Sequence, residues 1–76
     1  MKVLGYEVPQ SVIDNCIIRM KYEDRFRLSN IISVAILAGA PAGEISYRIA
    51  DRLIQRERKA GNIVLIYSAW TWIGKP

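Results

Sequence analysis

Residues 51–66, DRLIQRERKAGNIVLI, contain the change of pattern that decides the fold. In the first half, apolar residues recur three and four positions apart among basic ones, which predicts an amphipathic helix. After Gly61 the chain becomes an uncharged run of mostly β-branched residues, which predicts a strand. We therefore expect a helix that ends at Lys59 or Ala60 and a strand that follows directly, with Gly61 as the hinge.

Further helices and strands are predicted on either side of this unit. Proline suits the start of a helix, where its missing N–H is not needed, and serine suits the N-cap because its hydroxyl accepts a backbone N–H. A glycine followed closely by proline favours a helix end. On these grounds the expected helices begin at Pro9, after Ser29 and between Pro41 and Glu44, and the second ends near Gly39. The expected strands are a short one at Phe26 and a hairpin of residues 62–67 and 70–73, with its turn at Ser68 and Ala69.

Size and composition bound the class of protein. The 76 residues form one domain, residues 1–76, and an apolar content of 51% is enough for one core. The predicted order helix, strand, helix, helix, strand, strand defines a small α+β fold. The net charge of +4 and the pI near 9.6 favour an anionic partner such as nucleic acid.

The residue inventory argues against catalysis. The chain has no histidine and a single cysteine, Cys16, which excludes Ser-His-Asp and Cys-His mechanisms, an internal disulfide and a zinc site of Cys or His ligands. The segment GAPAGE, residues 39–44, lacks the spacing and the lysine of a phosphate-binding P-loop. We therefore expect a non-enzymatic protein with no cofactor, metal or small-molecule substrate. Cys16 belongs to the apolar stripe of the first helix and is interpreted as a small buried hydrophobe.

The sequence predicts neither secretion nor membrane insertion. The opening segment MKVLGYEVPQ includes Glu7 and Pro9, where a signal peptide needs an unbroken apolar core. The longest charge-free run, residues 28–43, is too short to cross a bilayer and contains Ser, Asn and Pro. A cytoplasmic protein without membrane contact is expected. Its small size is typical of a protein encoded by a phage or other mobile element.

The predicted order of elements resembles the winged-helix family of helix-turn-helix domains. The segments that carry the resemblance are FRLSNIISVAILAGAP, residues 26–41, and YRIADRLIQRERKAGNIVLI, residues 47–66. The resemblance implies a double-stranded-DNA-binding protein, a transcriptional regulator or an accessory factor, whose third helix enters the major groove. The DNA-binding residues that it implies on this helix are Ser46, Tyr47, Arg48, Asp51, Arg52, Arg56 and Lys59.

The basic helix also has a plainer interpretation, as a solvated face with ion pairs such as Glu44–Arg48. The spacing of the cations favours binding, because like charges four residues apart are mildly unfavourable without an anion to meet them. Arg25 and Arg27 are candidates for flanking phosphate contacts, although two exposed arginines around a buried Phe26 are the simpler interpretation.

Three features favour an alternative function as a protein-interaction module. The hairpin tip, YSAW at residues 67–70, has no cation for a phosphate, and the segment KYEDR, residues 21–25, contains two adjacent acidic residues. Glu57 lies on the inward side of the third helix, where it needs a cation such as Arg19 or Lys21 unless the helix is rotated from this projection. In this alternative the aromatic hairpin contacts a protein partner or a second copy of the chain, with one tryptophan kept in the core. Its candidate interface residues are Tyr67, Trp70 and Trp72.

Overall fold

The computed structural model describes residues 1–75, which form three helices and two antiparallel hairpins. The elements are β1 (Lys2–Val3), β2 (Tyr6–Glu7), α1 (Gln10–Tyr22), α2 (Leu28–Leu37), α3 (Glu44–Lys59), β3 (Ile63–Ile66) and β4 (Ala69–Trp72). This architecture confirms the predicted α+β class, the three helices and the C-terminal hairpin. The N-terminal hairpin was not predicted, so the observed order is β-β-α-α-α-β-β rather than α-β-α-α-β-β.

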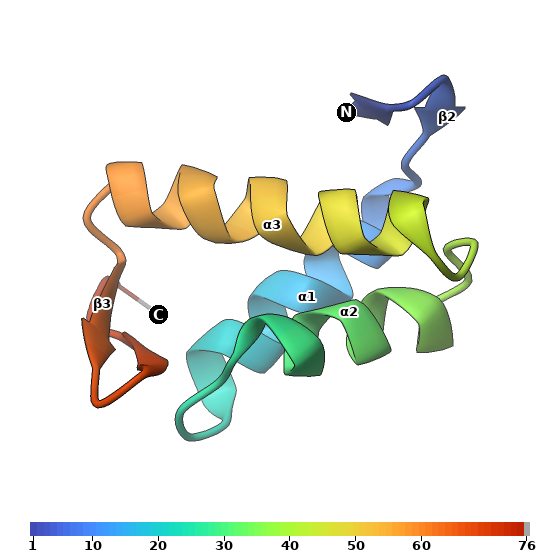
Figure 1. The fold of residues 1–76 in the computed structure, drawn as a ribbon. Helices are drawn as coiled ribbons and strands as arrows, with labels where there is room; N and C mark the ends of the chain where they lie inside the picture. Colours follow the sequence, from blue (N-terminus) through green and yellow to red (C-terminus); the bar gives the residue numbers. More distant parts are fainter. Residues whose placement is uncertain (76) are drawn as a thin grey trace.

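The three helices enclose the core, with α2 running beneath α3 and the two hairpins at opposite ends of α3 (Figure 1). Each helix contributes the apolar stripe that its sequence periodicity predicts, because residues three and four apart share a face. The largest fully buried side chains are Phe26, Met20, Ile31, Ile49 and Leu53. Ile63, the first residue of β3, is also buried and joins this core to the C-terminal hairpin.

The helices α2 and α3 end in the same glycine-dependent motif. After α3, Gly61 has a φ of 79°, its N–H bonds the carbonyl of Arg58, and the N–H of Asn62 bonds the carbonyl of Glu57. This pair of bonds is a Schellman motif, in which the left-handed residue is cheapest as glycine. Gly39 ends α2 in the same way, with a φ of 114°. Both predicted helix ends are confirmed.

The start of α2 differs from the prediction. The helix begins at Leu28, and Ser29 lies inside its first turn instead of at the N-cap. The side-chain oxygen of Asn30 accepts the backbone N–H of Arg27 at 2.8 Å, so an amide performs the capping expected of the serine hydroxyl. The backbone N–H of Arg27, which has no partner within the helix, is therefore bonded by the side chain of Asn30 and not by the hydroxyl of Ser29.

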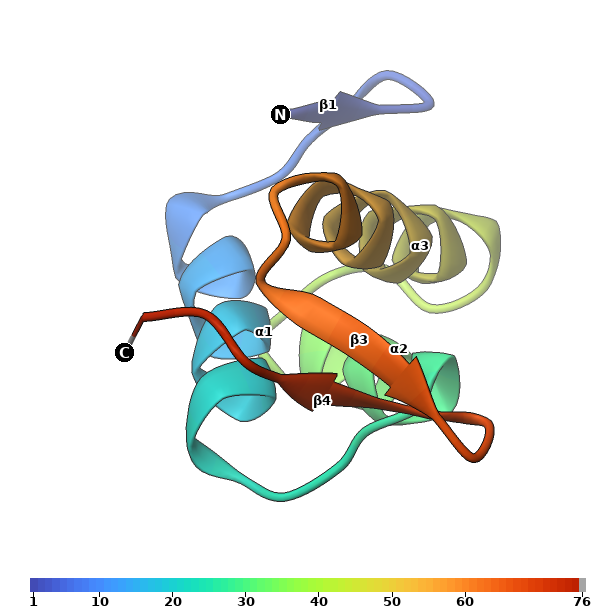
Figure 2. The same ribbon diagram turned by 90° about the vertical axis from the view of Figure 1, so that its left-hand side faces the viewer.

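The N-terminal hairpin packs on the side of α3 that faces away from α2 (Figures 1 and 2). Its two-residue turn, Leu4-Gly5, has positive φ at both positions, the geometry that matches the twist of a short hairpin. The side chain of Val3 is 1% exposed and belongs to the main core. Two-residue strands carry too little periodicity to be recognised from sequence, which explains why this element was missed.

The predicted short strand at Phe26 exists as a single bridge to β4. The N–H of Phe26 bonds the carbonyl of Trp70 at 2.9 Å, and the N–H of Trp70 bonds the carbonyl of Phe26 at 2.7 Å. The β3–β4 turn lies at Tyr67 and Ser68, one residue earlier than predicted, and both have positive φ. β4 therefore lies between Phe26 and β3, and β3 forms the outer edge.

Candidate nucleic-acid interface

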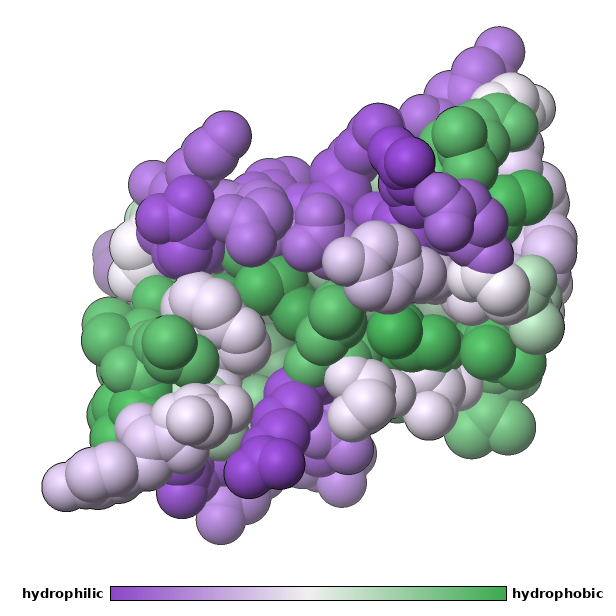
Figure 3. Space-filling view, in the orientation of Figure 1, coloured by the Kyte–Doolittle hydropathy of each residue, from purple (hydrophilic) through white to green (hydrophobic). Residues whose placement is uncertain are grey.

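The exposed side of α3 carries a ridge of hydrophilic residues along its whole length, as the space-filling view shows (Figure 3). At about 100° per residue, Arg48, Arg58 and Lys59 fall on the side opposite the buried Leu53. All three side chains are exposed. Arg58 and Lys59 lie in the last turn of the helix, where cations complement the helix dipole. Arg58 was not among the predicted DNA-binding residues; its place in the helical projection was the signal that indicated it.

Ser46 does not reach the surface, and the prediction that it faces a groove is wrong. Its side chain is fully buried and its hydroxyl donates to the carbonyl of Gly43 at 3.0 Å, within the first turn of α3. The small hydroxyl fits the core because this local bond satisfies it. Tyr47 is exposed and Asp51 is half-buried, so these two predicted residues remain accessible to different degrees.

Arg48 and Arg58 are only loosely engaged within the chain. The Nε of Arg48 lies 3.1 Å from an oxygen of Glu44 in an exposed i, i+4 ion pair, as expected for the solvated-face interpretation. Arg58 donates to the side-chain oxygen of Gln55 at 2.9 Å. Exposed pairs of this kind contribute less than about 1 kcal/mol, so both guanidinium groups are held only weakly. Lys59 has no ion-pair partner within residues 1–75.

Arg52 and Arg56 are held in place by the protein itself. Arg52 donates to the main-chain carbonyl of Lys2 at 2.8 Å, which ties the N-terminal hairpin to α3. Arg56 donates to the carboxylate of Glu57 at 2.9 Å, and the second oxygen of that carboxylate accepts the side-chain amide of Asn62, also at 2.9 Å. The predicted partners of Glu57, Arg19 and Lys21, form no hydrogen bond or ion pair with it.

The buried Glu57 therefore serves the joint between α3 and β3. The main-chain carbonyl of Asn62 accepts two further hydrogen bonds, from the backbone N–H groups of Ile73 and Gly74. Asn62 therefore links the end of α3 to the far end of β4. A buried carboxylate is stable only when its oxygens are bonded, and here both are. The Nε of Arg19 instead lies 3.5 Å from the carboxylate of Glu23, the exposed residue that follows α1.

The two arginines beside Phe26 have different surroundings. Phe26 is buried, as predicted, and both arginines are exposed. Arg25 donates to the carbonyls of Ile66 and Tyr67, at 3.2 Å to the latter, and so caps the tip of the C-terminal hairpin. Arg27 stands at the N-terminus of α2, and its side chain is the freer of the two for a flanking phosphate contact.

The C-terminal hairpin presents an apolar surface. Trp70 and Trp72 are both half-buried against the core, so neither is fully enclosed. The ring of Trp72 lies 5.3 Å from the Nζ of Lys21, and its indole N–H bonds the carbonyl of Lys75. Tyr67 is 89% exposed at the tip. Figure 3 shows hydrophobic surface over β3 and in a band between α3 and α2.

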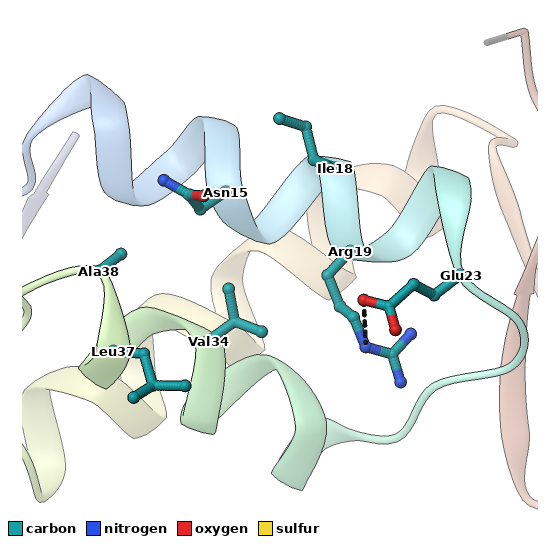
Figure 4. A pocket seen from close by; sticks show the side chains of 7 residues that line it. All are labelled: Asn15, Ile18, Arg19, Glu23, Val34, Leu37 and Ala38. Carbon is teal, nitrogen blue, oxygen red and sulfur yellow. Dashed lines mark ion pairs between the residues drawn. The ribbon is translucent and has the colours of Figure 1, made fainter.

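A shallow hollow of about 410 Å³ lies between α1 and α2 (Figure 4). Apolar side chains from both helices and the Arg19–Glu23 ion pair line it, including Ile18, Val34 and Leu37. The polar groups in its lining are Asn15 and the Arg19–Glu23 pair. The hollow is therefore a mainly apolar gap between two helix surfaces.

Burial fixes the state of the thiol of Cys16. Its side chain is fully buried, its Sγ lies 3.9 Å from the carbonyl of Ile31, and desolvation raises its pKa to about 11. A neutral, enclosed thiol is unreactive, which agrees with the interpretation as a small hydrophobe. Within residues 1–75, no group of three or more His, Cys, Asp or Glu side chains is placed to hold a metal ion.

No protein-family model, curated protein or solved structure matches this chain. Among the helices of residues 1–75, none combines the length and the apolar character needed to cross a membrane.

Proposed function

We propose that this protein binds double-stranded DNA without catalysing a reaction, as a transcriptional regulator or an accessory DNA-binding factor. The observation that carries the proposal is the row of exposed cations on α3, Arg48, Arg58 and Lys59. The order of three helices and a C-terminal hairpin, with a single-residue strand at Phe26 bonded to β4, supports the inference of a winged-helix domain. In this proposal the protein acts in the cytoplasm, and its compact size suits a phage or mobile element.

The N-terminal hairpin limits how α3 meets the duplex. It is attached through Arg52, so the side of α3 that carries Arg52 and Arg56 is partly occupied by the chain itself. The side that carries Tyr47, Arg48 and Arg58 is open. We therefore assign the groove-facing contacts to this open side, with Lys59 on the phosphate backbone. Arg contacts guanine edges with two parallel N–H donors, whereas Lys meets phosphate as a point charge.

A second set of contacts follows from α2. Arg27 lies at its N-terminus, where the free backbone N–H groups and the helix dipole favour an anion. A phosphate on this side and the cations of α3 on the other would hold the duplex in one register. Arg25 is committed to the hairpin carbonyls and is left out of this assignment.

Salt dependence and a matched pair of variants test the proposal. If Arg48, Arg58 and Lys59 each neutralise one phosphate, log K for random duplex DNA falls by roughly three units per decade of salt. The variant Arg48→Gln/Arg58→Gln should lose most of the binding measured at low salt. The control, Lys21→Gln/Lys75→Gln, removes the same charge away from α3 and should retain it. Equal losses in both variants, or no binding by the wild type at low salt, would refute the assignment.

A second candidate function, a protein-interaction module, is favoured by one observation. The hairpin tip exposes Leu65, Ile66 and Tyr67, and the neighbouring cation Arg25 is bonded to main-chain carbonyls. A wing of this composition suits an apolar partner better than a phosphate backbone. The two candidates differ in the α3 variants, since loss of Arg48 and Arg58 leaves an interaction through the hairpin intact.

A further inference from the structure

β3 is an edge strand without the features that normally protect an edge. It pairs with β4 on one side only, and its other side carries no strand within residues 1–75. Residues 62–74 contain no charged side chain and no proline. Val64, Leu65 and Ile66 are 38%, 56% and 42% exposed. Native edge strands usually carry lysine, proline or a bulge to prevent pairing with another chain, and this one has none of them.

The hydrogen-bond pattern identifies the main-chain groups that face outward. The N–H and C=O of Trp70 both bond Phe26, so they point away from β3. Leu65, which lies opposite Trp70, is therefore in a non-hydrogen-bonded pair with it. Main-chain groups alternate in direction along a strand, so those of Leu65 and Ile63 point to the open edge. Within residues 1–75 these groups form no hydrogen bond.

We propose that the open edge of β3 binds the β3 strand of a second copy of this chain, antiparallel, with the two-fold axis at Val64. In this register Leu65 of one copy lies opposite Ile63 of the other, and the same pair recurs on the other side of the axis. Each pair exchanges two hydrogen bonds, so four bonds form and all outward groups of both residues are satisfied. The result is a four-stranded sheet in the order β4, β3, β3, β4.

The chemistry of the edge favours a second copy over another partner. An isologous interface needs a surface that complements itself, and a neutral strand brings no like charges together across the axis. The same strand offers no cation or carboxylate to select a charged partner. In this register the exposed side chain of Val64 meets its counterpart, while Leu65 lies opposite Ile63 and Ile66 opposite Asn62 of the other copy, so the exposed apolar side chains leave water together. This inference does not depend on the proposed DNA binding.

Charge variants at the axis test the register. Wild type should sediment, without DNA, at twice its chain mass of 8.7 kDa as concentration rises. Val64→Lys and Val64→Glu each place like charges directly opposite and should remain monomeric, whereas an equimolar mixture of the two should restore the dimer. Thr71→Lys puts the same charge on the neighbouring strand, away from the axis, and should dimerise like the wild type. A monomeric wild type, a dimeric Val64→Lys, or a mixture that stays monomeric would overturn the proposal.

A cross-linking experiment covers the case in which a charged variant fails to fold. Val64→Cys places two thiols opposite each other in a non-hydrogen-bonded pair, where the Cα separation of about 4.5 Å permits a disulfide. Mild oxidation should therefore yield a covalent dimer. Leu65→Cys is the register control, because Leu65 faces Ile63 of the other copy and should cross-link little. The native Cys16 is buried and does not compete. Equal cross-linking at both positions, or none at Val64→Cys, would overturn the register.

Discussion

The guanidinium of Arg52 donates a hydrogen bond of 2.8 Å to the main-chain carbonyl of Lys2, although 50 residues separate them. This bond connects the open edge of the first hairpin to the middle of α3. Beside it, the side chain of Val3 enters the core. The N-terminal segment is thus part of the folded domain, and it decides which side of α3 remains open to a partner.

The docking of this hairpin makes Val3 a sensitive position. Val3→Ala should lower the free energy of unfolding by about 2 kcal/mol, since it removes two buried methyl groups and leaves a cavity. Leu4→Ala is the control, because Leu4 is exposed in the turn and its loss should change stability by less than about 0.5 kcal/mol. Chemical denaturation of both variants measures the difference. Similar small losses in the two would show that the hairpin is not packed on α3.

The turn of the C-terminal hairpin stores backbone strain in a non-glycine residue. Ser68 has a φ of 66°, in the left-handed region. Ser68→Gly should therefore raise the free energy of unfolding by about 0.5–1 kcal/mol. The matched change Ser33→Gly, on the exposed side of α2, should lower it by about 0.5 kcal/mol, because glycine is a poorer helix former. Thermal melts that give the two changes the same sign would contradict the turn geometry.

The joint between α3 and β3 depends on the carboxylate of Glu57. Glu57→Ala leaves the half-buried side-chain amide of Asn62 without this acceptor, and we expect a loss of about 2 kcal/mol in unfolding free energy. Glu44→Ala breaks only the exposed pair with Arg48 and should lose less than about 1 kcal/mol. Both variants remove one negative charge, so net charge does not distinguish them. An equal effect would mean that the joint tolerates an unbonded amide.

The buried thiol of Cys16 predicts a loss of stability at alkaline pH. Burial raises its pKa from 9.0 to about 11, so between these values the unfolded chain releases a proton that the folded chain retains. The free energy of unfolding therefore falls as pH rises through this window, by up to about 1.4 kcal/mol per pH unit. Cys16→Ala lacks the thiol and should decline less steeply, since its other titrating groups are the same. Parallel declines of the two proteins would contradict the prediction.

The local pattern of the sequence determined the three helices and the C-terminal hairpin. The periodicity of residues 44–59, the change to a β-branched run and the position of Gly61 are all properties of neighbouring residues, and each was confirmed. The core positions of Cys16 and Phe26 followed from the same patterns. Local rules succeed here because helix ends and apolar faces are set by interactions a few residues apart.

Only the tertiary structure decided which side chains of α3 are available. The burial of Ser46 depends on how α3 is rotated against α2, and the engagement of Arg52 depends on a hairpin at the other end of the chain. The pairing of Glu57 with Arg56 and Asn62, instead of a cation from α1, is also a result of packing. Helical spacing fixes which residues share a face. Whether that face meets solvent depends on contacts between segments that are distant in the sequence, and the pattern of neighbouring residues does not predict these contacts.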